Sequence, residues 1–357
     1  MTGLRRSLPF DEYYVGWVCP LVNEQVAARA VLDEIHDDAT GLGTTLNDEN
    51  VYTLGRIGKL NVVIAGLPEK AQGSGAAARV ASDMVRTYYR IKVVLLVGTG
   101  GGVPGFKIEG VAGDIRLGDV VVCDASKQSN AVIQYDSGKA LQGGVFQPTG
   151  WQLDKPPERI RGAISKYQVG SIFGEHDIAH SIEDLIEWYP ALKSYARPSE
   201  EIRAFRADYV HQNKDQACTE CCSFTDANLL QQDARDFPEE VVVHYGSIGS
   251  AALVVRDSSL RDRLAREQNI ICFEMEAAGM MDGFPCLVIR GISNYADSHK
   301  NDTWERYAAL AAAVYAHAIV LRMNWQSMME PDPISNTWAA TLKSLKAERR
   351  KMKEPRV

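Results

Sequence analysis

Residues 270–279 read I-I-C-F-E-M-E-A-A-G. This apolar run ends in two glutamates, Glu274 and Glu276, and carboxylates at the edge of a hydrophobic core are unfavourable unless a specific partner pairs with them. If a strand continues through this point, both glutamates project to one side of it and Met275 to the other. If a helix has already begun, they diverge. The small residues at 277–279 then allow a following helix to approach the sheet closely.

On both sides of this stretch, apolar runs alternate with segments of helical period. Uniformly apolar runs predict buried strands, and hydrophobic residues at helical spacing predict amphipathic helices. The predicted strands are 13–19, 51–57, 60–66, 91–97, 119–123, 241–245, 270–273 and 286–292, and the predicted helices are 23–36, 74–90, 182–195, 259–268 and 304–323. This order predicts an α/β fold with helices on both faces of a central sheet.

The alternation lapses between residues 150 and 238, which are rich in charged residues, Pro and Gln. We interpret 150–238 as an inserted segment, because the elements before and after it complete one sheet. The prediction is therefore a single catalytic domain over residues 1–330. Residues 331–357 are basic and have helical spacing, which predicts a solvated C-terminal helical tail.

Composition excludes several classes of function. The 357 residues are 45% hydrophobic and 24% charged, and the net charge of -7 disfavours nucleic-acid binding, which needs concentrated Lys and Arg. No apolar run approaches the roughly 20 residues of a membrane span, and no apolar segment follows the basic pair at the N-terminus. We therefore expect no membrane partner and a cytoplasmic location. The odd number of cysteines, seven, is typical of an intracellular protein.

One cluster of potential metal ligands lies in the inserted segment. His211, Cys218, Cys221 and Cys222 could together hold zinc, since C-x-x-C with a nearby His is a recognisable fragment of such sites. A closed structural site normally uses two separated ligand pairs, however, whereas these four fall within twelve residues. We favour an exposed loop and predict no metal and no cofactor, with zinc as the alternative.

Polar or glycine-rich groups follow several predicted strands. The run G-T-G-G-G at 98–102 is predicted to be a loop after strand 91–97, and Glu24 follows the first strand. Ser293 and Asn294 follow strand 286–292. Each has a structural explanation, as a tight strand exit, an acidic first helical turn or a helix cap. Open α/β sheets nevertheless bind ligands at such strand ends, so the set together predicts a site.

Five motifs, taken in their order along the chain, resemble those of a known protein family. Glu24 after a strand, G-T-G-G-G at 98–102, G-D-V-V-V at 118–122, F-E-M-E-A-A-G at 273–279 and I-S-N-Y-A-D at 292–297 occur in that order. The sequence from about residue 12 to 323 resembles the purine nucleoside phosphorylase / uridine phosphorylase superfamily, in particular its nucleosidase branch and the fungal nucleoside phosphorylase-like domains. The resemblance implies a three-layer α/β/α sandwich with a mixed, partly barrel-like central sheet. It also implies cleavage of a ribose–base N-glycosidic bond.

The resemblance further implies roles for individual residues. Glu276 would bind the ribose hydroxyls, Met275 would pack against the sugar, and residues 250–255 would flank the base. That segment reads S-A-A-L-V-V, whereas family members usually keep a Gly and a polar residue there. The substrate-binding residues implied are Thr99, Gly100, Gly101, Ser250, Val254, Phe273, Met275 and Glu276.

Glu24, Asn294 and Asp297 are the implied catalytic residues. Glu24 falls where the nucleosidases place the carboxylate that activates water, whereas phosphorylases tend to place an Arg that binds phosphate. Asn294 falls where adenine-preferring nucleosidases carry an Asp, and an amide there suits 6-oxopurines. Asp297 is the alternative residue that would donate a proton to the departing purine. We predict a purine nucleosidase that acts on inosine and guanosine and possibly on adenosine, and a homo-oligomer, with a dimer favoured.

Three alternatives stay open. A phosphate-dependent phosphorylase would need an Arg in the site, for which Arg56, Arg90 and Arg290 are candidates. A nucleosidase for phosphorylated nucleotides would need basic residues from the insert, such as Arg203 and Arg206. A silent nucleoside-sensing module is the third, and we expect turnover instead because both catalytic-type carboxylates are kept and we recognise no second domain.

Overall fold

The structure is a computed structural model of the whole chain. It describes residues 5–40, 48–69, 71–105, 114–124, 131–142, 146–148, 152–153, 156–199, 203–237 and 239–330. The chain divides into two compact units, Met1–Met323 and Asn324–Val357. In the second unit, α9 (Trp325–Met329) begins where the Asn324 side chain accepts from the Ser327 N–H. The predicted tail at 331–357 lies outside the described residues.

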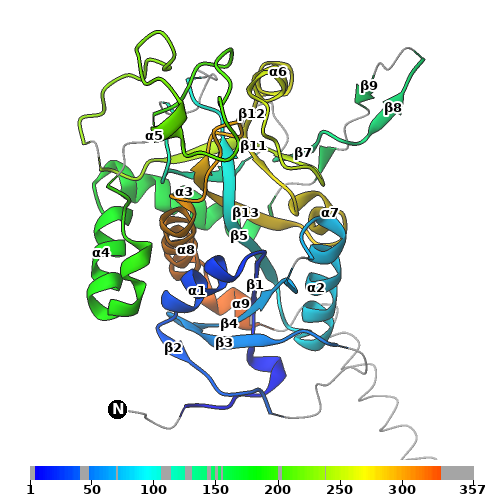
Figure 1. Cartoon of the computed structure of the whole chain (residues 1–357). Coiled ribbons are helices and arrows are strands. Elements are labelled where there is room, and N and C mark those ends of the chain that lie inside the picture. Colours follow the sequence, from blue (N-terminus) through cyan, green and yellow to red (C-terminus); the bar gives the residue numbers. More distant parts are fainter. Residues whose placement is uncertain are drawn as a thin grey trace, which may run out of the picture. The chain divides into compact units, whose positions relative to one another are not determined.

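Five strands of the first unit close into a barrel (Figure 1): β5 (Val93–Gly102), β6 (Val120–Cys123), β11 (Val243–Ser250), β12 (Ile270–Glu274) and β13 (Cys286–Asn294). β13 pairs with β5, and β11 pairs with β6 and β12, all in parallel. β12 pairs with β5, and β13 with β6, in antiparallel fashion. The sheet is therefore mixed and closes on itself, which confirms the predicted partly barrel-like architecture.

The sheet extends from the barrel in both directions. Beyond β5 the order is β1 (Val15–Cys19), β4 (Leu60–Gly66), β3 (Tyr52–Ile57) and β2 (Glu34–Ile35). Beyond β11 come β7 (Val132–Gln134) and β10 (Gln152–Leu153), and β8 (Gly138–Ala140) pairs separately with β9 (Phe146–Pro148). β3 and β4, both predicted as strands, pair in antiparallel fashion.

Helices lie on both sides of the sheet, as predicted (Figure 1). On one side, α8 (Glu305–Arg322) packs against β5 and β13 and is itself covered by α1 (Val22–Ala30), α3 (Glu158–Ile172) and α4 (Ile178–Trp188). Because α8 is enclosed on several sides, it is apolar nearly all round and buries most of its alanines. On the other side, α2 (Ser74–Thr87) packs against α7 (Ala277–Gly283). No described helix has the length and hydrophobicity that a membrane span requires.

The inserted segment contains more regular structure than its sequence indicates. Beside the predicted helix, which is α4 followed by the 3-10 helix η2 (Pro190–Tyr195), it contains α3 and the short α5 (Cys218–Cys221). After the insert, α6 (Ser258–Gln268) follows β11 as predicted, and the 3-10 helix η1 (Phe10–Glu12) precedes β1. The predicted helix 23–36 ends at Ala30, after which Glu34 and Ile35 form the edge strand β2.

A further local prediction is wrong. The glycine run 98–102 is not a loop, because it continues β5, pairs with β13 at Gly98 to Gly101 and pairs with β12 at Gly101 and Gly102. As predicted, α7 lies against the sheet, and Gly279 also allows it to approach α2 closely. A Cβ at Gly279 would lie 2.1 Å from the Ser74 carbonyl oxygen.

Candidate active site

A cavity of about 250 Å³ opens where β5, β12 and β13 end beside the first turn of α1. It is close to the size range of small-molecule sites, roughly 300–1,000 Å³. Nine residues predicted from the sequence line it: Glu24, Thr99, Gly100, Gly101, Val254, Phe273, Met275, Glu276 and Asn294. The structure therefore brings together groups that are spread over most of the domain.

The Glu24 carboxylate lies in the wall of this cavity and is 3% exposed. Its Oε2 accepts from the Leu21 N–H at 2.7 Å, and its Oε1 accepts from the Thr99 N–H at 2.7 Å and from Thr99 Oγ1 at 3.1 Å. Burial raises the pKa of Glu24 to about 7, while Arg290 and these hydrogen bonds oppose the shift. A carboxyl group that titrates near neutral pH is well matched to accepting a proton from water.

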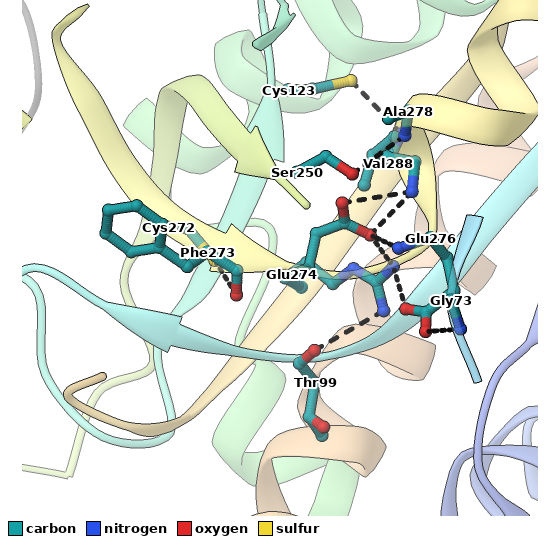
Figure 2. A network of polar contacts seen from close by, with 12 residues as sticks. Gly73, Thr99, Cys123, Ser250, Cys272, Phe273, Glu274, Glu276, Ala278 and Val288 are labelled. Atoms are coloured by element: carbon teal, nitrogen blue, oxygen red, sulfur yellow. Dashed lines mark hydrogen bonds and ion pairs between the residues drawn. The ribbon is translucent and has the colours of Figure 1, made fainter. Parts of the chain in front are cut away.

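β12 ends in Glu274, and α7 begins a few residues later. The role of Glu274 is structural (Figure 2). Glu274 Oε2 accepts from the Glu276 N–H at 3.0 Å, and both carboxylate oxygens accept from the Ala277 N–H at 3.0 and 3.1 Å. It therefore caps the beginning of α7 and also pairs with Arg290.

Glu276 is the second buried carboxylate that faces the cavity, and it is 5% exposed. Its Oε1 accepts from the Gly73 N–H at 3.1 Å, and its Oε2 lies 3.4 Å from Arg290 Nη2 (Figure 2 shows Glu276 beside Gly73). Burial raises the pKa of Glu276, and Arg290 partly offsets this. Each oxygen therefore has one protein partner, and a carboxylate oxygen can accept a further hydrogen bond from a ligand.

Arg290 joins these carboxylates at the centre of the site. It projects from β13, is 1% exposed, and donates from Nη1 to the Thr99 carbonyl at 3.5 Å. Burial alone would lower the pKa of Arg290, but Glu274, Glu276 and Glu24 together hold it above its ordinary value. Gly98 leaves room for this arrangement, since a Cβ there would lie 2.5 Å from Arg290 Nη1 and 2.6 Å from Glu24 Oε1.

Asn294 lies at the end of β13 with its side-chain amide in the cavity wall. Its Oδ1 accepts from the Ala296 N–H at 3.0 Å, and its Nδ2 donates to Ser293 Oγ at 3.0 Å. Because the amide oxygen is held by a backbone donor, the orientation of the amide is defined. One of the two Nδ2 hydrogens remains for a ligand.

Asp297 and Ser250 do not line the cavity. Asp297 Oδ1 accepts from the His299 N–H at 2.9 Å, and its Oδ2 lies 3.7 Å from Arg261 Nη1. Burial raises the pKa of Asp297, opposed by Arg261. Ser250 Oγ accepts from the Ala278 N–H at 2.9 Å. In this structure both residues therefore support neighbouring backbone rather than face a ligand.

The cavity contains charged residues that sequence reasoning did not assign to it. The loop after β13 and the start of α8 contribute Lys300, Asp302 and Glu305. The one feature of the sequence that could have indicated them is their position shortly after I-S-N-Y-A-D. The other lining residues are Pro20, Leu21, Gln72, Leu253, Val255, Glu274, Arg290, Ser293 and Ala296. Five acidic side chains and two basic ones thus surround the space.

The other arginines considered lie elsewhere. Arg56 pairs with Glu34 at 2.9 Å, and the Arg90 guanidinium lies 5.3 Å from the centre of the Tyr14 ring. Arg206 pairs with Asp208 at 3.1 Å, and Arg203 lines a different cavity. Of the arginine candidates, only Arg290 lines the candidate site.

No protein-family model matches the chain. A nucleotide-binding leucine-rich repeat (NLR)-like protein of Hyaloscypha variabilis is 37% identical over 330 residues, which cover 91% of this chain and 31% of that protein. The ATP nucleosidase Cap17 of Escherichia coli is 24% identical over 261 residues, 71% of this chain and 41% of that protein. This chain therefore spans only about a third to two fifths of the length of the curated relatives that it matches.

Among solved structures, the 5'-methylthioadenosine/S-adenosyl homocysteine nucleosidase of Helicobacter pylori superposes with a TM-score of 0.52 at 13% identity. The match covers 87% of this chain and 98% of that one. At this identity the likeness establishes the fold. The chain therefore has the fold of this nucleosidase structure.

Proposed function

We propose that this chain is an N-glycosidase that hydrolyses the bond between a purine and its ribose. The observation that carries the proposal is the position of Glu24, a buried carboxyl with a pKa of about 7, in the same cavity wall as Glu276. One carboxylate can take a proton from water while the other holds the sugar. These are two of the functions that nucleoside hydrolysis requires.

In the proposed reaction, Glu276 accepts hydrogen bonds from the ribose hydroxyls, which is charge-assisted and selective for a vicinal pair. As the glycosidic bond breaks, C1′ develops positive charge, and the buried carboxylates stabilise it. Asn294 donates a hydrogen bond to the departing purine. Because an amide is not an acid, the proton that the purine gains is the one that Glu24 removes from the attacking water, passed on through solvent. Water that loses a proton to Glu24 attacks C1′, which yields free base and ribose.

The composition of the wall favours water over phosphate as the nucleophile. Phosphate is anionic, and five acidic side chains face the cavity against Arg290 and Lys300. Arg290 is already paired with Glu274 and Glu276. The Thr99 N–H and hydroxyl both donate to Glu24 instead of being free for an anion. These contacts support hydrolysis rather than phosphorolysis.

For the base, the apolar residues Leu253, Val254 and Phe273 offer a flanking wall. The amide of Asn294 favours 6-oxopurines, so we propose inosine and guanosine as substrates, with adenosine accepted less well. A dimer remains our proposal for the assembly, and light scattering coupled to size-exclusion chromatography tests it.

A phosphorylated nucleotide is the second candidate substrate. Lys300 lines both the candidate site and a neighbouring cavity of about 780 Å³, whose wall also includes Arg256 and Lys214. A base and ribose in the first cavity would place 5′-phosphates toward these cations. The similarity to a protein named ATP nucleosidase agrees with this candidate. In this candidate, the cation that the insert contributes is Lys214 rather than Arg203 or Arg206.

The first experiment measures release of free base by the purified chain from inosine, guanosine, adenosine, AMP and ATP, in phosphate-free buffer and with added phosphate. Equal release in both buffers with a free reducing sugar supports the nucleosidase. Release that requires phosphate, with ribose 1-phosphate as product, contradicts the role of Glu24. Ligand binding by calorimetry without release would indicate a sensing module, which the NLR-like relative makes a natural third outcome.

A further inference from the structure

We propose that His211, Cys218, Cys221 and Cys222 bind one Zn²⁺ that fastens the inserted segment to the loop following β13. This site lies outside the candidate active site and is independent of the proposed reaction. The sequence alone favoured a metal-free loop, because the four residues are close together along the chain. The tertiary structure brings the ligand atoms of three of them, His211, Cys221 and Cys222, within 4.8 Å of one another.

The distances among three of the ligand atoms match a tetrahedral ion. Cys221 Sγ lies 3.7 Å from His211 Nε2 and 3.7 Å from Cys222 Sγ, and the three ligand atoms all lie within 4.8 Å of one another. Zn–S bonds of about 2.3 Å and Zn–N bonds of about 2.0–2.1 Å place two tetrahedral thiolates roughly 3.8 Å apart. They place a thiolate and an imidazole nitrogen roughly 3.6 Å apart. No large movement is needed to admit the ion.

The same distances disfavour a disulfide. Bonded sulfurs are about 2.05 Å apart, well short of the 3.7 Å between Cys221 and Cys222, and all seven cysteines are free. Three thiols and an imidazole without such a bond are a donor set that zinc prefers. The binding reaction is balanced if each coordinating thiol releases its proton to solvent as the Zn–S bond forms.

Cys218 supplies the fourth ligand. It stands three residues before Cys221 in C-x-x-C, and its thiol is in hydrogen-bond contact with Cys222. His299 is the competing candidate, because it is 7% exposed and neither ring nitrogen has a hydrogen-bond partner within the described residues. Its ring, however, stacks on Phe205 with centroids 4.0 Å apart, which fixes its plane. A Cys₃His set thus uses only the groups already gathered around Cys222.

The ion would lie where the insert meets the edge of the active site. The His211 N–H donates to Ser298 Oγ at 3.0 Å, a backbone hydrogen bond that coordination through the His211 ring leaves in place. Ser298 and His299 directly precede Lys300, which lines the candidate active site. Zinc would therefore hold in place the backbone that positions Lys300.

The first test uses the wild-type full chain, purified without a histidine tag from zinc-supplemented cells. Elemental analysis is expected to find about one Zn²⁺ per chain. After chelation, titration with Co²⁺ should produce a thiolate-to-metal charge-transfer band and the intense d–d bands of a tetrahedral site. Absence of both the zinc and the Co²⁺ spectrum overturns the proposal, and recovery of a Cys221–Cys222 disulfide by mass spectrometry overturns it in favour of a redox pair.

Variants identify the ligands. Cys221→Ser should weaken Co²⁺ binding by more than the roughly 10–100-fold that loss of an outer-shell partner causes. Ser223→Ala, next to the cluster but without a ligand atom, should bind as wild type does. Cys218→Ser should lower the charge-transfer intensity by about a third, since one of three thiolates is lost. If His299→Ala has that metal-binding defect and Cys218→Ser has none, the assigned fourth ligand is wrong.

A zinc ion that only binds within the insert and one that also fastens the insert to the loop after β13 should have different effects on stability and on KM. We expect chelation to lower the melting temperature of the wild type and added Zn²⁺ to restore it, with no such response in Cys221→Ser. If the chain hydrolyses nucleosides or nucleotides, chelation should raise KM more than it lowers kcat, because Lys300 contacts ligand rather than the reacting bond. An unchanged melting temperature and KM would contradict the fastening role even if zinc is bound. These metal readouts do not depend on the proposed activity.

Discussion

The Glu24 carboxylate accepts a hydrogen bond from the backbone N–H of Thr99 at 2.7 Å, although 75 residues separate the two in sequence. This contact holds a buried carboxylate at the end of β5, where its pKa rises to about 7. The same Thr99 amide would otherwise be available to an anion. In the proposed reaction, this hydrogen bond is one of the contacts that favour water over phosphate.

Glu24→Gln is expected to lower kcat for base release by roughly 10²–10⁴, the usual contribution of a positioned general base. Glutamine has the same shape but cannot accept a proton, so the loss should exceed any change in KM. Steady-state kinetics in phosphate-free buffer measure it. The matched control, Glu267→Gln, changes an exposed glutamate of α6 and should leave kcat unchanged. A Glu24→Gln enzyme with wild-type kcat would remove Glu24 from the mechanism.

The pH dependence of kcat/KM should show an acidic limb near pH 7. Glu24 acts as a base only when it is deprotonated, and burial raises its pKa to about 7. The rate should therefore fall about tenfold for each pH unit below that value and level off above it. The measurement is kcat/KM between about pH 5 and pH 8 with a thermal scan at each pH. A flat profile over this range would contradict the assignment.

Glu276→Gln should reduce the preference for ribonucleosides over their 2′-deoxy analogues by about 10- to 100-fold. A hydrogen bond to a charged group contributes about 1.5–3 kcal/mol, and the deoxy substrate lacks one of the two donors. The ratio of kcat/KM for inosine and 2′-deoxyinosine, compared between wild type and variant, reports this loss. An unchanged ratio would mean that Glu276 does not contact the 2′-hydroxyl.

Arg290→Leu should lower the free energy of unfolding by about 3–5 kcal/mol, because it leaves two buried carboxylates without their cation. Urea unfolding measures the change. Arg56→Leu is the control, since its ion pair with Glu34 is partly exposed and should contribute about 1 kcal/mol or less. Equal effects of the two substitutions would show that the Arg290 pairs contribute little.

Gly98→Ala should impair catalysis, because the new methyl group would lie within 2.6 Å of both Arg290 Nη1 and Glu24 Oε1. Displacing the Glu24 carboxylate breaks its bond to Thr99, so we expect kcat to fall by at least about tenfold. Gly75→Ala provides the contrast. Among the described residues, nothing lies within 4 Å of its added Cβ, and an alanine within α2 should stabilise the helix by roughly 0.5–1 kcal/mol. Full activity in Gly98→Ala would show that the site tolerates the shift.

The sequence alone determined the α/β class, most strand positions and the residues that end those strands. Buried strands and amphipathic helices leave local periodic patterns, and E-M-E-A-A-G at 274–279 combines a strand end with a helix beginning. The individual site residues came from the resemblance of the ordered motifs to a known superfamily, and nine of the eleven implied residues line the cavity.

Only the tertiary structure decided how those groups pair. The run 98–102 becomes strand because β12 and β13 supply its hydrogen-bond partners, and Arg290, read from the sequence as a candidate phosphate ligand, becomes the partner of Glu274 and Glu276. The pKa of Glu24 likewise depends on burial that no local pattern encodes. Periodicity shows which face of a helix or strand is buried. Ion pairs, pKa shifts and the cluster of His211 with the cysteines depend instead on segments that are distant in sequence and meet only in the folded chain.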